Sequence, residues 1–335
     1  MEFRDIPKVD LHCHLDGGLR VNTLIQLAKK EGIALPSEDL AELQRFFKNQ
    51  AMSANLAKYL ELFKFTTAVM QSEDSLYRIA YEAVADLHAD GVYLAELRFA
   101  PELHTNKGLT PAAIMDATMA GLTDASTKFG ISTGIIVCAI RNLEPSTYAA
   151  EIAAEYLGKG VIGFDLAGNE VGNLPAKFSK SFSICREAKV PITIHGGEAA
   201  GEASILSALA QGANRIGHAT SMRSAELLQE VKTAKVTLEV CVTSNLDTRA
   251  CRVVEEHPVD FFLKNGVSVV PCTDNRLMSH TTLSQEYALL ANTFGYGLPE
   301  FRQFFHYGIS SSFLPETARE NARLKGDNKF GTFKT

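Results

Sequence analysis

The chain has 335 residues, of which 46% are hydrophobic and 21% charged, and its formal net charge at pH 7 is −6. These proportions are typical of a globular protein with an ample core, and the acidic balance argues against a nucleic-acid or anionic-membrane partner. No segment has the pattern of a secretion signal or of a membrane span, and six widely spaced cysteines indicate reduced core thiols. We therefore expect a compact cytoplasmic protein that acts on a small molecule; nothing in the sequence specifies an oligomeric state.

Eight short β-rich segments follow one another along the chain. They cover residues 9–15, 91–99, 132–140, 161–167, 191–196, 215–219, 236–243 and 267–273. Segments with helical periodicity lie between most of them, including 111–129, 146–157 and 203–211. Strands that alternate with helices form parallel βαβ units, and eight units without a linker predict one α/β domain, residues 1–335, folded as a (β/α)8 TIM barrel.

Two regions depart from this regular alternation. Residues 21–90 are too many for one crossover, so we expect several helices inserted after the first strand, forming a lid over the substrate. Residues 298–322 are predicted to be helical and to pack against the bottom or side of the barrel.

The first strand carries two histidines, His12 and His14, separated by one residue. Because side chains alternate along a strand, both imidazoles are expected on the same face, inside the barrel. Such a pair suits a divalent metal, since imidazole nitrogen is a favoured zinc ligand. Taken alone, the pair is also compatible with two hydrogen-bonded barrel histidines.

Three further polar residues, His195, His218 and Asp274, fall at the predicted ends of strands 5, 6 and 8. Active sites of TIM barrels lie at the carboxyl ends of the strands, so these side chains should face one mouth. The other five histidines are interpreted as surface or packing residues: His88, His104, His257, His280 and His306. The pattern predicts a site for zinc, or another borderline divalent ion, with the ligands His12, His14, His195 and Asp274.

Glu198 follows His195 in the sequence HGGE, on the turn that leaves strand 5. A carboxyl group beside a metal-activated water suits proton transfer, although exposed loop glutamates are common. His218 is expected to hydrogen-bond the water and stabilise developing charge. Cys272 should share the face of Asp274, where a small core residue is favoured over a thiolate ligand.

Several motifs occur together in a fixed order over almost the whole chain: PKVDLHCHLDGG, ELRFAP, GFDLAGNE, TIHGGEAAG, RIGHAT, LEVCVTSN and CTDN. With them, the chain resembles the adenosine deaminase family of metal-dependent amidohydrolases. The resemblance implies hydrolytic removal of the 6-amino group of adenosine, and of 2′-deoxyadenosine, in purine salvage. It also implies one zinc ion per chain, held by the four ligands named above.

The resemblance assigns roles to the remaining site residues. Glu198 is expected to protonate purine N1 and so needs a raised pKa, while His218 orients the hydrolytic water. The residues implied in substrate binding are His14, Asp16 near the ribose 5′-hydroxyl, Gly168 with its backbone N–H near purine N3, and Asn275 near N7. Leu60 and Phe63 are candidate lid residues, with ordinary helix packing as the alternative.

Two motifs differ from the usual family pattern. HGGE replaces HAGE, which removes one methyl group from the turn. TDN replaces the more frequent TDD, so Asn275 stands where an aspartate often contacts N7. Because N7 is an acceptor, an aspartate must be protonated to donate to it, whereas an asparagine amide donates at any pH.

The sequence favours adenosine deamination over several other functions. Adenine or a modified adenosine remains an alternative substrate, whereas AMP is disfavoured because Asp16 would repel its phosphate. A non-catalytic nucleoside-binding protein is disfavoured because every expected ligand and the acid are present. Amidohydrolases of esters or lactams often use a carboxylated lysine, and GFDLAGNE has no lysine at the end of strand 4.

Overall fold

The computed structural model describes residues 2–52, 55–143 and 146–333. Its eight strands form one parallel sheet in which each strand pairs with the next along the chain. The strands are β1 (Lys8–His14), β2 (Val92–Phe99), β3 (Ser132–Ile140), β4 (Val161–Ala167), β5 (Ile192–Gly196), β6 (Arg215–His218), β7 (Thr237–Val240) and β8 (Val269–Pro271). A parallel bridge between Cys13 and Asp274 joins the first strand to the segment after the last. The predicted (β/α)8 barrel is confirmed.

Helices alternate with the strands around the barrel. Those before β2 are η1 (Phe3–Asp5), α1 (Val21–Glu31), α2 (Leu40–Met52), α3 (Leu56–Leu60), α4 (Phe63–Val69) and α5 (Glu73–Ala89). Those between β2 and β6 are η2 (Pro101–His104), α6 (Pro111–Phe129), α7 (Tyr148–Glu155), η3 (Pro175–Phe178), α8 (Ser179–Glu187) and α9 (Glu202–Ala210). The remainder are α10 (Ala225–Ala234), α11 (Val242–Asp247), η4 (Val254–Glu256), α12 (Val259–Lys264), α13 (Leu283–Phe294), α14 (Leu298–Ser311) and α15 (Glu316–Phe330).

Local sequence signals explain where the predicted helix 111–129 begins and ends. Thr110 accepts a hydrogen bond from the backbone N–H of Ala113, and Pro111 occupies the first helical turn. Gly130 ends the helix in the left-handed conformation at a φ of 68°. The structure gives α6 the predicted bounds, whereas α7 and α9 differ from their predicted ranges by one or two residues at each end.

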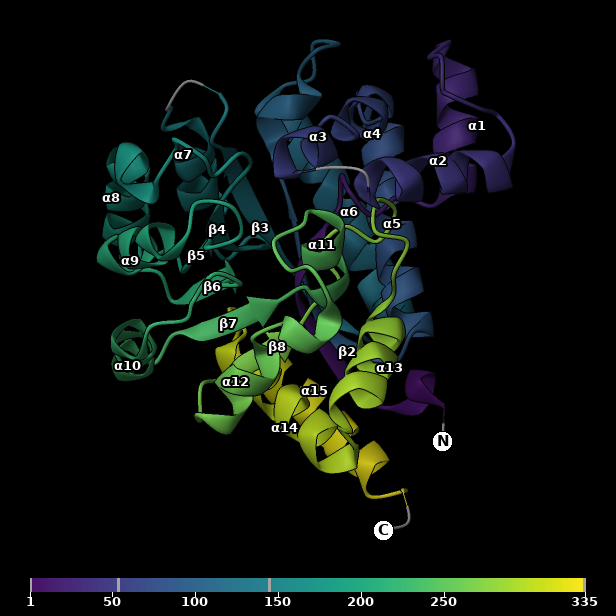
Figure 1. The fold of residues 1–335 in the computed structure, drawn as a ribbon. Helices are drawn as coiled ribbons and strands as arrows, with labels where there is room; N and C mark the ends of the chain where they lie inside the picture. The colour runs from purple at the N-terminus through teal and green to yellow at the C-terminus, as the bar shows by residue number, and fades with distance from the viewer. Residues whose placement is uncertain (1, 53–54, 144–145, 334–335) are drawn as a thin grey trace.

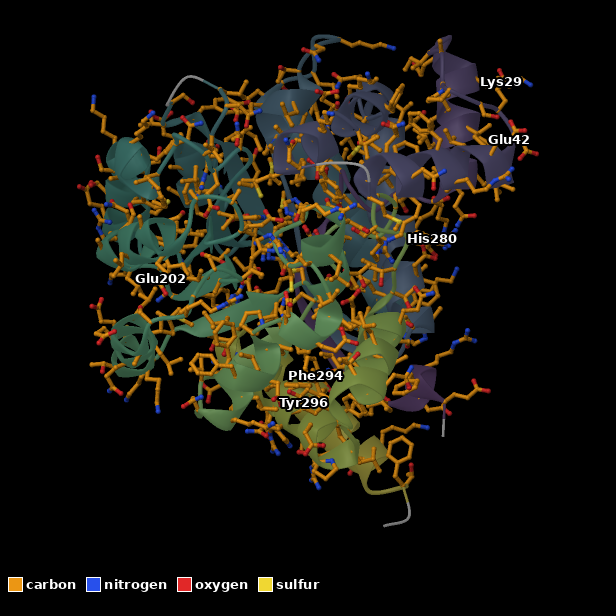
Figure 2. The ribbon with its side chains drawn as sticks, in the orientation of Figure 1. Lys29, Glu42, Glu202, His280, Phe294 and Tyr296 are labelled. Atoms are coloured by element: carbon orange, nitrogen blue, oxygen red, sulfur yellow. The ribbon has the colours of Figure 1, made fainter. Side chains whose placement is uncertain are left out.

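The region 21–90 contains several helices, as predicted. Helices α1 to α4 gather at one end of the molecule in Figure 1, and Lys29 of α1 and Glu42 of α2 extend from its surface in Figure 2. Helix α5 instead packs against α6 and β2, so it belongs to the outer ring of barrel helices.

The predicted strand 236–243 is wrong at its carboxyl end. Strand β7 stops at Val240, and α11 begins at Val242. The backbone N–H of Thr243 donates to the Glu286 carboxylate at 3.1 Å, and Glu286 comes from α13. This distant contact satisfies a backbone group of the first turn of α11, and an apolar run alone does not reveal it.

The predicted helical tail is two helices. The two helices are separated by residues 312–315, which end with Pro315. A proline disfavours the helical conformation of the residue before it, so the first helix cannot readily continue through this segment. Glu96 stabilises the non-helical segment between the two helices, because it accepts hydrogen bonds from the Ser312 hydroxyl at 2.7 Å and the Phe313 N–H at 2.6 Å. Helix α14 packs against β1 and β8, so the tail contacts the barrel as expected. Within the described ranges, every helix is too short or too polar to cross a membrane.

Candidate active site

A cavity of about 250 Å³ lies at the carboxyl ends of the barrel strands. Helices α3 and α4 form one wall, in which Leu60 and Phe63 both face the cavity. The other lining residues are His14, Leu56, Tyr59, Lys64, Thr67, Leu103, Ile140, Asn142, Leu143, Ala167, Gly168, His195, Glu198, His218, Asp274 and Asn275. The cavity therefore combines an apolar wall with the polar residues expected at the mouth of the barrel.

The predicted metal ligands converge beside this cavity. The Nε2 atom of His14 lies 3.2 Å from Nε2 of His195 and 3.5 Å from Oδ1 of Asp274. The Nε2 atom of His12 lies 3.4 Å from the same carboxylate oxygen and has no hydrogen-bond partner. Ligand atoms placed tetrahedrally about 2.1 Å from a zinc ion are about 3.4 Å apart. The three distances match this spacing, so the side chains fit a small divalent cation.

The structure also brings His218 close to this group. Candidate ligand atoms of His12, His195, His218 and Asp274 all lie within 4.8 Å of one another, and an overlapping group contains His14, Asp165 and His195. The Nε2 atom of His218 lies 3.7 Å from Oε2 of Glu198. His218 thus stands between the candidate metal site and the predicted acid.

Carboxylates behind the histidines hold two of the rings in place. Oε2 of Glu239 in β7 lies 2.9 Å from Nδ1 of His12, and Oδ2 of Asp165 in β4 lies 3.0 Å from Nδ1 of His195. A proton held on Nδ1 leaves the Nε2 lone pair free for a metal. Burial lowers the pKa of His195 to about 3, which keeps this ring neutral. On the carboxylate side, the Ser244 hydroxyl donates to Oδ2 of Asp274 at 2.5 Å.

Glu198 is buried beside the candidate metal site. Its Oε1 atom accepts a hydrogen bond from the Thr248 hydroxyl at 2.9 Å. Burial is the largest influence on this carboxyl group and raises its pKa above the usual value, although His218 and Thr248 oppose the shift. The direction is the one that an acid catalyst needs near neutral pH.

A second glutamate holds the loop that carries Glu198. The Glu170 carboxylate, which follows β4, accepts the backbone N–H groups of Gly197 at 2.5 Å, Ala199 at 2.5 Å and Ala200 at 2.7 Å. Gly197 has a φ of +80°, and a Cβ there would lie 2.6 Å from Ile205, so glycine is required at this position. A Cβ on Gly196 would meet its nearest atom at 3.5 Å, so this position has room for the alanine of the usual HAGE motif.

The predicted substrate-binding residues differ in whether they line the cavity. Gly168 and Asn275 line the cavity. Asn275 donates from Nδ2 to Oδ1 of Asp274 at 2.7 Å. Asp16 is buried with its Oδ1 atom 3.8 Å from Nδ1 of His14, but it is not among the residues that line the cavity. Of the four predicted substrate-binding residues, His14, Gly168 and Asn275 therefore line the cavity, and Asp16 does not.

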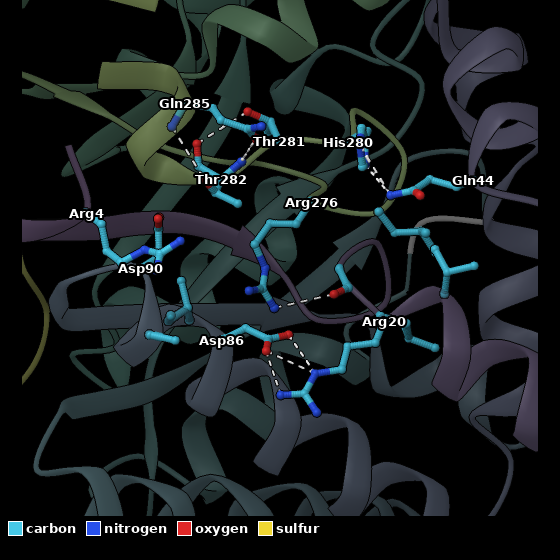
Figure 3. Close-up of a pocket in the computed structure, with 16 residues that line it drawn as sticks. Arg4, Arg20, Gln44, Asp86, Asp90, Arg276, His280, Thr281, Thr282 and Gln285 are labelled. Carbon is cyan, nitrogen blue, oxygen red and sulfur yellow. Dashed lines mark hydrogen bonds and ion pairs between the residues drawn. The ribbon is translucent and has the colours of Figure 1, made fainter. Parts of the chain in front are cut away.

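A second cavity, of about 460 Å³, lies beside the loops that follow β1 and β8, as Figure 3 shows. Arg20 pairs there with Asp86 at 2.6 Å, and Arg276 reaches the backbone oxygen of Gly18 at 3.4 Å. Both groups of potential metal ligands found in the described part of the chain lie at the first cavity. The second cavity is therefore not where the predicted chemistry belongs.

Of the five histidines interpreted as surface or packing residues, some lie at the surface and others are buried. His280 is exposed and contacts Gln44, as Figures 2 and 3 show. His88 is also exposed, and His306 pairs with Asp327 at 3.2 Å. His104 and His257 are buried.

Sequence reasoning did not identify the residues that support the site. Asp165 and Glu239 are single acidic residues within otherwise apolar strand segments, VIGFDLA and VTLEVCVT. An ionisable side chain in a fully buried strand needs a partner, and this signal was available in the sequence. Glu170 and Thr248 gave no such signal, because both lie in polar segments.

The comparisons with known proteins point to one family. The family model described as "Adenosine deaminase" matches residues 7–325. A protein named adenosine deaminase from Mycobacterium ulcerans is 41% identical over 331 residues, covering 93% of this chain and 91% of that protein. A protein named probable adenosine deaminase from Dictyostelium discoideum is 37% identical and covers 97% of this chain and 42% of that protein.

Solved structures share the fold over nearly the whole chain. The adenine deaminase from Arthrobacter aurescens has a TM-score of 0.88 at 26% identity, covering 96% of this chain and 98% of that one. The N6-mAMP deaminase of Arabidopsis has a TM-score of 0.87 at 25% identity, covering 97% and 99%. With a family match that spans the barrel and relatives about 40% identical over its length, the chain belongs to the adenosine deaminase family.

Proposed function

We propose that this protein is a zinc-dependent hydrolase that converts adenosine to inosine and ammonia, and that it acts on 2′-deoxyadenosine as well, in purine salvage. The observation that carries the proposal is the convergence of the three histidines and Asp274 next to a buried glutamate. The relatives named adenosine deaminase support the choice of substrate. A cytoplasmic location is part of the proposal and is supported by the six free, buried cysteines.

The proposed metal site uses His12, His14, His195 and Asp274. Three nitrogens and one carboxylate oxygen are a ligand set that suits zinc. Zinc, when bound, supplies the Lewis acidity that makes a water molecule nucleophilic near neutral pH. The side-chain spacing of 3.2 to 3.5 Å and the unpartnered Nε2 atom of His12 support this assignment.

Glu198 is proposed to donate its proton to N1 of the purine. Addition of water to C6 is unfavourable while N1 is unprotonated, because negative charge would accumulate on the ring nitrogen. Burial raises the pKa of Glu198, which favours the protonated form that this step needs. His218, 3.7 Å from Glu198, is proposed to orient the attacking water.

The rest of the cavity is proposed to hold the nucleoside. The N–H of Gly168 faces N3, the Asn275 amide faces N7, and Asp16 reaches the 5′-hydroxyl. Because Asp16 lies 3.8 Å from His14 and does not line the cavity, this contact requires Asp16 or the neighbouring wall to move when the substrate binds. We further propose that the region 21–90 covers the site as a lid through its helices α1 to α4, for which the cavity wall formed by Leu60 and Phe63 is the support.

Adenosine, 2′-deoxyadenosine, adenine and AMP, followed by ultraviolet absorbance on a sample of known metal content, test the proposal. We expect turnover of the two nucleosides and little of adenine or AMP. Preferred turnover of adenine would favour the alternative activity, and preferred turnover of AMP would assign the exposed cavity residue Lys64 to the phosphate. Glu198→Gln should keep its metal and lose most turnover, and wild-type turnover by this variant would refute the assignment of the acid.

A further inference from the structure

A chain of hydrogen bonds runs from His218 into the interior of the protein. The Nδ1 atom of His218 lies 3.0 Å from Nδ2 of Asn245 in α11. The Oδ1 atom of Asn245 lies 3.1 Å from Nε2 of His257, a residue that the proposed function does not use. All three side chains are buried, with at most 2% of each residue exposed.

A backbone amide fixes the direction of this chain at its inner end. The N–H of Val259, the first residue of α12, donates to Nδ1 of His257 at 3.2 Å. A backbone N–H can only donate, so Nδ1 of His257 must carry the lone pair. Burial lowers the pKa of His257 to about 3, so the ring is neutral at physiological pH. Its single N–H proton is therefore on Nε2, facing Asn245.

The orientation of the Asn245 amide follows from this tautomer. Its oxygen receives two donors, the Nε2–H of His257 and the Thr220 hydroxyl at 2.9 Å. With the amide turned around, its NH2 group would face the Nε2–H of His257, and two donors would oppose each other. The oxygen therefore faces His257, and the NH2 group faces His218.

We infer that Asn245 and His257 are positioning residues that hold His218 in the tautomer with its proton on Nε2. The Asn245 amide can only donate to Nδ1 of His218, so this nitrogen carries the lone pair and the other carries the hydrogen. Nε2 of His218 is the atom that faces Glu198 and the candidate metal group. His218 thus presents a hydrogen-bond donor to the reacting centre and orients the attacking water by donating to it.

The role of His218 in orienting water rests on the proposed function, whereas the tautomer of His218 does not. The tautomer can be read by long-range ¹H–¹⁵N correlation spectra of protein labelled with ¹⁵N-histidine, in the metal-free and the zinc-loaded forms. The signals of His218 and His257 are identified by their loss in His218→Gln and His257→Gln. We expect Nδ1 of His218 to be pyridine-like and Nε2 to be pyrrole-like at neutral pH. A pyrrole-like Nδ1 in the wild-type protein would overturn the inference, whatever the protein deaminates.

Three variants test the consequence for catalysis. Asn245→Asp replaces the donor with an acceptor and should move the His218 proton to Nδ1. In serine proteases, a wrong histidine tautomer lowers kcat about 10⁴-fold, and we expect a fall of about 10²–10³-fold here, with KM and zinc content nearly unchanged. His257→Leu removes the donor to Asn245 and should lower kcat about 10-fold or more. His257→Gln keeps an N–H donor at this position and should restore activity to within about threefold of wild type.

The outcomes separate this inference from the proposed function. If no substrate in the panel is turned over, the spectra still decide the tautomer. If Asn245→Asp moves the proton while kcat is unchanged, the positioning role is wrong although the tautomer is right. If His257→Gln and His257→Leu lose activity equally, with unchanged His218 spectra, His257 acts only through packing and its role here is refuted.

Discussion

The Nε2 atoms of His14 and His195 lie 3.2 Å apart, although 181 positions separate the two residues in the chain. The two nitrogens can share a hydrogen bond when one of them carries a proton, and they can both bind a cation when neither does. The site can therefore be tested by metal content as well as by turnover.

Replacing His12 by alanine should remove zinc. The change deletes a nitrogen ligand and leaves Glu239 without its imidazole partner. We expect metal affinity to fall by about 100-fold or more, with turnover falling in parallel, as measured by elemental analysis after dialysis and by ultraviolet assay. The matched control is His88→Ala, which removes an exposed histidine. Full zinc occupancy in His12→Ala would contradict the ligand assignment.

Thr248→Val should shift the alkaline limb of the pH profile to higher pH. Burial raises the pKa of Glu198, and the Thr248 hydrogen bond to its carboxylate opposes the rise. Without this donor the pKa rises further. Because the protonated form acts, activity should persist to a pH about one unit higher or less. The measurement is kcat/KM for adenosine against pH, with Thr67→Val as a control on the same cavity. Movement of the acidic limb to higher pH, with the alkaline limb unchanged, would show that Glu198 acts as a carboxylate.

Asn275→Asp should retain activity but lose it earlier as pH rises. The new carboxyl group would stand where Nδ2 of Asn275 now lies 2.7 Å from Asp274, and a neighbouring carboxylate raises its pKa. Only the protonated form can donate to N7, so activity falls above that pKa. The control is Asn142→Asp, since Asn142 already uses its side-chain oxygen to accept the Asn169 N–H. An unaltered profile would show that position 275 does not contact the base.

Gly17→Ala should destabilise the protein and disturb the site. A Cβ on Gly17 would collide with Oδ1 of Asn275, and a shift of the Asn275 side chain would disturb its hydrogen bond to Asp274. We expect a loss of about 1–3 kcal/mol in the free energy of unfolding, measured by denaturant titration, together with a higher KM. Gly297→Ala is the control, because a Cβ there meets its nearest atom at 3.7 Å. Equal stability of Gly17→Ala and wild type would show that Asn275 is free to move.

Glu286→Gln should stabilise the protein, increasingly so from mildly acidic to neutral pH. Burial raises the pKa of Glu286 to about 7, from 4.5 in the unfolded chain. The folded state therefore binds the proton more tightly, and the contribution of this group to stability is lost as pH rises from about 4.5 to about 7. The full difference is up to about 3 kcal/mol.

Melting curves of Glu286→Gln and wild type between pH 4.5 and 8 measure this difference. The amide keeps the size of the side chain and can still accept the Thr243 N–H. The two proteins should be most alike at the acidic end and diverge towards neutral pH. Parallel curves across the range would mean that Glu286 does not titrate within it.

The alternation of apolar strands and helices was sufficient to predict the barrel, and the period of two in β1 put His12 and His14 on one face. The ends of the strands were predicted less well. The apolar run from Val236 to Thr243 continues through the turn into α11, and the carboxylate that takes up the Thr243 N–H belongs to α13. A contact between distant segments decides this boundary, so a local pattern cannot locate it.

The convergence of the proposed ligands and Glu198 at one mouth of the barrel was predictable because it combines the barrel rule with family motifs. The residues that orient them were not. His257 was interpreted as a surface or packing residue, and its contact with Asn245 depends on how the segment before α12 lies against α11. Likewise, the proximity of His218 to the metal ligands depends on the left-handed backbone at His218 and Asp274, with φ values of 69° and 57°. Strained backbone of this kind is set by the surrounding fold.

The bridge between Cys13 and Asp274 joins the two ends of the barrel at the metal site. The N–H of Asp274 donates to the oxygen of His12, and the N–H of His14 donates to the oxygen of Asp274, both at 2.8 Å. Asp274, whose backbone closes the barrel, also supplies the carboxylate of the proposed ligand set. Because Asp274 follows β8, a chain emerging from the ribosome cannot complete the proposed ligand set before β8 has been synthesised, and cation binding by all four residues would belong to the last stage of its biogenesis.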